Sequence, residues 1–145
     1  MNKNYVIDSV FIVDKKSSTP LFLQRFGKNV PDSIWNIFGY LSTFDVFAKY
    51  IYSIGLVSEN LQIHKLIFKG QNNETHFIIS NNEVVAVIVI VIYTIKSEKY
   101  EKFIENKIKI ITDKFEEMFI DEIKQHQNTN VYKKFEDICK NILKE

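Results

Sequence analysis

The sequence predicts a three-layer α/β (α+β) domain in which a mixed five-stranded sheet lies between one helix and a pair of helices. Two observations predict it: an apolar run over residues 84–93, and a second apolar stretch over residues 10–13. Both are rich in β-branched residues, which favour strands. Both are apolar at successive positions, which indicates a strand covered on both faces. The two segments therefore predict two neighbouring central strands.

The composition is that of one folded domain over residues 1–145, because 46% of the residues are hydrophobic and 14% are aromatic. Nineteen basic and 18 acidic residues leave a net charge of +1, so no electrostatic footprint for nucleic acid or an anionic membrane is expected. The single cysteine, Cys139, cannot form an internal disulfide, and no signal peptide or membrane span is visible. We therefore expect a cytoplasmic protein that reaches membranes only through its partners.

Turn residues divide the predicted strands into two groups. Residues 5–14 and 21–26 form a β-hairpin, and residues 61–69, 75–80 and 84–93 form an antiparallel meander. If the first and fifth strands are adjacent at the centre, the strand order is 2-1-5-4-3. This order explains why these two strands alone are apolar on both sides.

A helix is predicted from Ile34 to about Ser53, with Asp32 or Ser33 as its N-cap and Gly55 just beyond its C-terminus. It crosses one face of the sheet between the second and third strands. Apolar residues at helical spacing are predicted to face the sheet. They are Ile37, Leu41, Phe44, Ala48 and Ile51, flanked by Ile34, Tyr40, Phe47 and Tyr52.

Two further helices are predicted to cover the other face. The first begins after the N-cap Ser97 and continues to about Lys124. The second begins near Val131, after a break at residues 126–129. The predicted order of elements is therefore β-β-α-β-β-β-α-α.

This element order is accompanied by three segments that carry a family resemblance: Val13-Asp14-Lys15, Pro20-Leu21-Phe22, and a first helix with Phe38-x-x-Leu41-Ser42 and Phe47-Ala48. In these features residues 5–143 resemble the longin domain of the longin/roadblock superfamily. The resemblance implies a non-enzymatic platform without a cofactor. Such a platform binds small GTPases, another longin or roadblock domain, or a peptide in the groove between the first helix and the third strand. We therefore expect an adaptor or a subunit of small-GTPase-regulating or vesicle-trafficking machinery, and a homodimer as one form of its assembly.

Partner-binding residues are predicted on the first helix and along this groove. Trp35, Val46 and Tyr50 lie off the stripe that faces the sheet, and Trp and Tyr are over-represented among interface hot spots. Isolated surface apolar residues are also normal, and a one-residue error in helical phase would place these side chains in the core. The predicted partner-binding set is Trp35, Phe38, Val46, Tyr50, Leu66 and Phe68.

No residue pattern predicts catalysis or a metal site. The three histidines, His64, His76 and His126, have no acidic or cysteine cluster beside them in the sequence and are expected to be structural or surface residues. Cys139 is predicted to be a buried, inert thiol. The chain has no glycine-rich phosphate loop.

A PAS-like small-molecule sensor is the alternative, because such domains share a hairpin, a helical segment and a three-stranded meander. They hold a ligand in the cavity between sheet and helices. Their middle region contains several short helices, whereas residues 34–53 are predicted to form one continuous helix. A coloured ligand that co-purifies with the protein would favour the sensor.

Overall fold

The computed structural model describes residues 5–17, 19–27, 37–59, 64–94, 98–125 and 129–144. The elements in chain order are β1 (Tyr5–Asp14), β2 (Pro20–Arg25), α1 (Ile37–Ser53), β3 (Lys65–Lys69), β4 (Glu74–Asn81), β5 (Val85–Tyr93), α2 (Glu98–Lys124), the 3-10 helix η2 (Thr129–Phe135) and α3 (Glu136–Leu143). This is the predicted order. One detail differs, because the last helix begins as a 3-10 helix and becomes α-helical only at Glu136.

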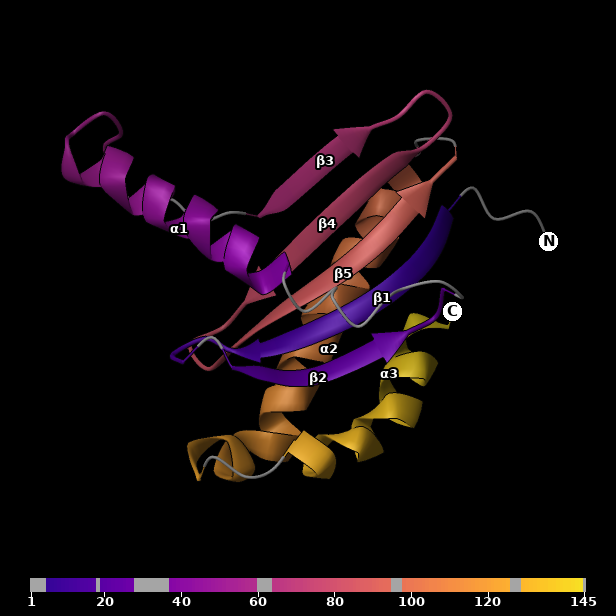
Figure 1. Cartoon of the computed structure of the whole chain (residues 1–145). Helices are drawn as coiled ribbons and strands as arrows, with labels where there is room; N and C mark the ends of the chain where they lie inside the picture. Colours follow the sequence, from indigo (N-terminus) through magenta and orange to yellow (C-terminus); the bar gives the residue numbers. More distant parts are fainter. Residues whose placement is uncertain are drawn as a thin grey trace.

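The five strands form one sheet with the order β2-β1-β5-β4-β3, as predicted (Figure 1). All four pairings are antiparallel, so the sheet is antiparallel and not mixed as expected. The connection through α1 explains the difference. It returns the chain to the end of the sheet at which β2 began, so β3 runs in the direction of β2 and β5 runs opposite to β1.

The central strand β5 is buried on both faces, as its apolar run predicts. Val87, Val89 and Val91 belong to the apolar core that contains α2 and α3 residues, whereas Ile88 and Ile90 belong to a second core on the other face. Side chains alternate between the two faces of a strand, which accounts for this division. Strand β1 is divided in the same way.

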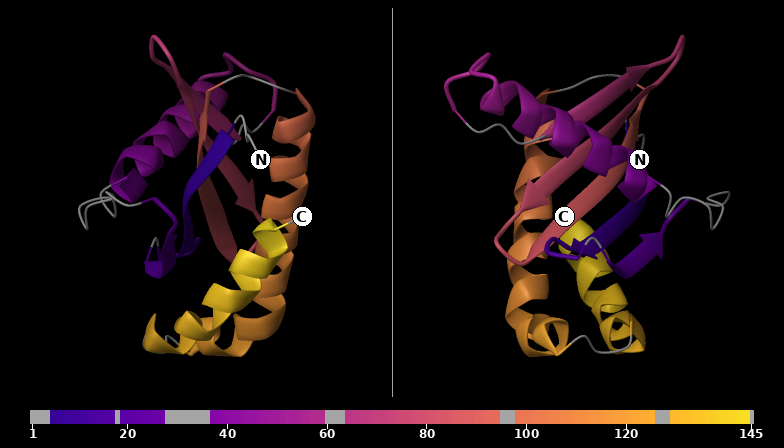
Figure 2. Two further views of the ribbon diagram at one scale, coloured as in Figure 1. Left: turned by 90° about the vertical axis from the view of Figure 1, so that its right-hand side faces the viewer. Right: turned by 60° about the vertical axis from the view of Figure 1, so that its left-hand side comes forward.

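The three layers are visible when the molecule is turned edge-on, with α1 on one side of the sheet and α2 and α3 on the other (Figure 2). Helix α2 places Ile104, Ile108, Ile111, Phe115 and Phe119 against the sheet and α3, and all five are buried. Their spacing of three and four residues follows the helical period. Among the described residues, this side holds the larger core.

Helix α1 ends at the predicted glycine. Gly55 has φ = 77°, and its N–H donates to the carbonyl of Tyr52 while the N–H of Leu56 donates to that of Ile51. These two bonds define a Schellman motif, in which glycine adopts the left-handed conformation at little cost.

Among the side chains that the structure describes, the flanks of the predicted α1 stripe are exposed; those of Ile37, Tyr40, Leu41 and Phe44 lie outside the described residues. Ala48 is buried and Ile51 is half-buried, but Phe47 and Tyr52, expected to flank the stripe, are 62% and 46% exposed. The C-terminal part of α1 extends past the β3 edge of the sheet (Figure 1). Residues 34–36, at the predicted start of this helix, lie outside the described residues.

Candidate functional site

Exposed apolar side chains gather on α1. Val46 is 65% exposed, Phe47 62% and Tyr50 58%. Because helical residues three and four apart share a face, Val46 and Phe47 both neighbour Tyr50 on the helix surface. The helix therefore presents an aromatic and aliphatic face to solvent.

Strand β3 adds an exposed ring on the same side of the sheet. Leu66 pairs with Phe77 and belongs to the core on the α1 face, and Phe68, two residues further, points to that face as well. Phe68 packs edge-on against Phe77 with ring centroids 5.5 Å apart, yet it remains 58% exposed. We call Val46, Phe47, Tyr50 and Phe68 together the α1–β3 surface.

The six residues predicted to bind a partner have different positions. Val46 and Tyr50 lie on the exposed face of α1, Phe68 is exposed, and Leu66 is half-buried below it. Trp35 lies outside the described residues, and so does the side chain of Phe38. Phe47 was missed as an exposed residue because helical phase placed it beside the core stripe.

A buried polar cluster between the sheet and α2 was not predicted. His76 is fully buried, with Nε2 at 3.0 Å from Oε1 of Glu74 and Nδ1 at 3.6 Å from Oε1 of Glu101. Nζ of Lys65 lies 3.6 Å from Oε1 of Glu101 and 3.5 Å from Oε1 of Glu105. The same-strand spacing of Glu74 and His76 was a usable signal, because residues two apart share a strand face. The partners on α2 and β3 could not be read from local spacing.

Tyr93, on β5, borders this cluster. Its ring centroid lies 4.5 Å from that of His76, and its hydroxyl is buried without a hydrogen-bond partner among the described residues. Burial, followed by the charge of Glu101, raises the pKa of Tyr93 above its ordinary value. The phenol of Tyr93 therefore stays uncharged where it borders the cluster.

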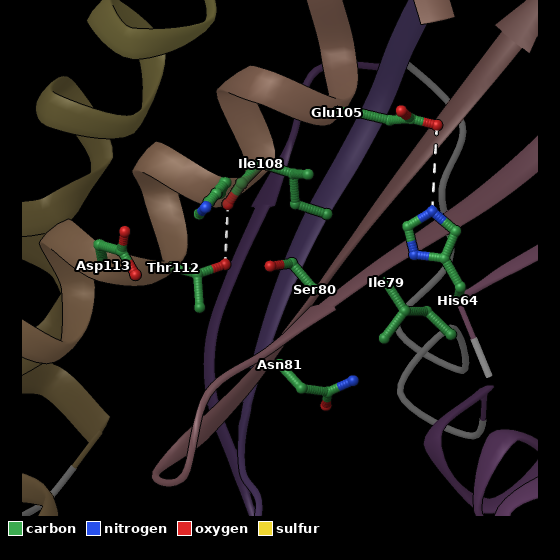
Figure 3. A pocket seen from close by; sticks show the side chains of 9 residues that line it. His64, Ile79, Ser80, Asn81, Glu105, Ile108, Thr112 and Asp113 are labelled. Atoms are coloured by element: carbon green, nitrogen blue, oxygen red, sulfur yellow. Dashed lines mark hydrogen bonds and ion pairs between the residues drawn. The ribbon is translucent and has the colours of Figure 1, made fainter. Parts of the chain in front are cut away.

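A cavity of about 300 Å³ lies beside the cluster, between β4 and α2 (Figure 3). His64 and Glu105 stand at one end, with Nε2 and Oε1 4.0 Å apart, and Thr112 and Asp113 lie further along α2. The Thr112 hydroxyl donates to the carbonyl of Ile108 at 2.7 Å. The hydroxyl hydrogen of Thr112 is thereby used within its own helix, and its oxygen remains an acceptor.

Other chemical candidates are inert where the structure describes them. Cys139 is fully buried, and burial raises its pKa to about 12, so the thiol is the unreactive core residue that was predicted. Within the described ranges, no three His, Cys, Asp or Glu side chains are placed to bind a metal ion. None of the helices described there has the length and apolarity needed to cross a membrane.

Neither a protein-family model nor a curated protein matches the chain. Among solved structures, the chain is similar to the gliding protein MglB from Thermus thermophilus, with 12% sequence identity and a TM-score of 0.39. The similarity covers 58% of this chain and 59% of that one. At this TM-score it says nothing about what the chain binds.

Proposed function

We propose that the protein is a non-enzymatic binding platform that engages a protein partner through the α1–β3 surface. The observation that carries the proposal is the contrast between the two sides of the sheet. The side of α2 and α3 has a continuous buried core, whereas α1 and β3 keep Val46, Phe47, Tyr50 and Phe68 largely exposed.

Burial of this surface by a partner would be favourable. Fully burying one large apolar side chain is worth about 1.5–3 kcal/mol, and aromatic residues contribute most to interface hot spots. Three such side chains on α1 and one on β3 suit a partner with a complementary apolar face.

The partner class follows from the resemblance to longin domains. A small GTPase, or another longin or roadblock domain including a second copy of this chain, is the partner we propose. The predicted strand order and element order, both present in the fold, support the resemblance. The role would then be that of an adaptor or subunit in small-GTPase-regulating or trafficking-like machinery.

The test is a pull-down of the full chain against a panel of small GTPases, each in both nucleotide states, with light scattering of the free protein. Tyr50→Ser and Phe68→Ser should each weaken binding or self-association at least about tenfold, as hot-spot substitutions do. Both side chains are exposed, so neither variant should unfold.

Ile110→Ser is the matched control, because Ile110 is a 48% exposed apolar residue on α2, in the opposite layer. It should bind as the wild type does. A strictly monomeric protein that binds no member of the panel would contradict the proposal, as would equal losses in all three variants.

A further inference from the structure

The buried histidine of β4 stands between two carboxylates that belong to different elements. Nε2 of His76 lies 3.0 Å from Glu74 on its own strand, and Nδ1 lies 3.6 Å from Glu101 on α2. A neutral imidazole has one N–H, whereas an imidazolium has two. Only the protonated ring can therefore direct a proton toward both carboxylates at once.

The charges around His76 come from each element packed against it. Beyond the two carboxylates, β5 contributes the Tyr93 ring, and β3 contributes Lys65, which lies within 4 Å of two carboxylates of α2. With the imidazole protonated, charges alternate in sign along one row: Glu74, His76, Glu101, Lys65 and Glu105. Without that proton, two carboxylates flank a neutral ring.

We propose that protonation of His76 strengthens the attachment of the N-terminal part of α2 to β4, and that loss of this proton loosens it. The neutral ring keeps its shorter contact, to Glu74, and turns an unprotonated Nδ1 toward the carboxylate of Glu101. Nδ1 has no hydrogen-bond partner among the described residues, so Glu101 then keeps its contact to Nζ of Lys65 on β3, at 3.6 Å, and loses the one to β4. A polar contact in a site of low dielectric is worth more than the same contact in water, which makes its loss measurable.

The loosening is local because the charged contacts differ along α2. Glu101 and Glu105 lie in the first third of the helix, beside the buried Ile104, whereas Phe115 and Phe119 pack into the apolar core further along it, away from His76. Contacts between apolar side chains involve no ionisable group, so their strength does not change through a titration. The far part of α2 therefore serves as an internal reference, and the cavity lined by His64 and Glu105 borders the part that loosens.

The test measures amide hydrogen exchange of the full chain between about pH 5 and 8, the range in which histidine ordinarily titrates. The readout is the protection of amides 102–105 relative to amides 117–121 of the same helix, since this ratio cancels the intrinsic pH dependence of exchange. Ring resonances of His76 in the same samples report its protonation. The ratio should fall several-fold as His76 loses its proton.

Glu101→Gln removes the charge that the imidazolium contacts while keeping the side-chain size, and should abolish the pH dependence of the ratio. Glu117→Gln makes the same change on the same helix at a side chain that is 74% exposed, and should behave as the wild type. A ratio that stays constant through the His76 titration in the wild type would overturn the proposal. A pH dependence that persists in Glu101→Gln would also overturn it, as would a His76 ring that does not change protonation in this range.

Discussion

Replacement of Phe115 by alanine tests whether the core between β2, α2 and the C-terminal helices is packed as described. Phe115 is fully buried, and its ring centroid lies 4.8 Å from that of Phe119, 5.1 Å from Phe135, 5.4 Å from Tyr132 and 6.1 Å from Phe22. The ring thus touches the sheet, its own helix and η2 at once. Its removal leaves a cavity that no single element can close.

We expect Phe115→Ala to lower the free energy of unfolding by about 4 kcal/mol, since Phe→Ala in a core costs about 3–5 kcal/mol. For a domain of this size the loss corresponds to a fall in melting temperature of about 10 °C. Urea unfolding followed by circular dichroism measures the first quantity, and a thermal scan measures the second.

Phe47→Ala is the matched control, because Phe47 is 62% exposed on α1. The same substitution there should change stability by no more than about 0.5 kcal/mol. The reasoning is refuted if Phe115→Ala costs less than about 1 kcal/mol, a third of the smallest usual cost of such a change, or if the two variants lose equal stability. Equal losses would mean that the outer face of α1 is buried as deeply as the aromatic core.

Three further groups give direct predictions. The pKa values of Tyr93 and Tyr132 are raised first by burial and then by nearby carboxylates, so both phenols should stay neutral when free tyrosine ionises, near pH 10. The pKa of each phenol is higher in the folded than in the unfolded protein. The stability that this difference contributes is complete below about pH 10 and is lost as the pH rises beyond it. Absorbance of the phenolate should show that Tyr93→Phe and Tyr132→Phe each remove one late-ionising group; ionisation of both phenols near pH 10 in the folded protein would contradict this. Gly55→Ala should lower the free energy of unfolding by about 1 kcal/mol, because only the left-handed backbone opposes it and no atom lies within 4 Å of the added Cβ. Gly55→Asn should cost less in the same urea titration, and an alanine variant as stable as wild type would argue against the Schellman motif.

Local patterns determined the strand order of the sheet, although the sheet was expected to be mixed and is antiparallel. The apolar runs of 10–13 and 84–93 predicted two strands covered on both faces, and that requirement placed β1 beside β5 and ordered the other three strands. Gly55 predicted the end of α1, since few residues accept a positive φ. These inferences succeed because strand periodicity and helix ends depend on residues close in the sequence.

Only the tertiary structure decided how distant elements face one another. His76 and Glu101 are brought together by the rotation of α2 over the sheet, and that rotation is set by the whole apolar interface rather than by either residue. The exposure of Phe47 likewise depends on how α1 lies over the sheet. Packing between layers fixes both, because a helical stripe predicts which side chains share a face but not how much of that face finds a partner.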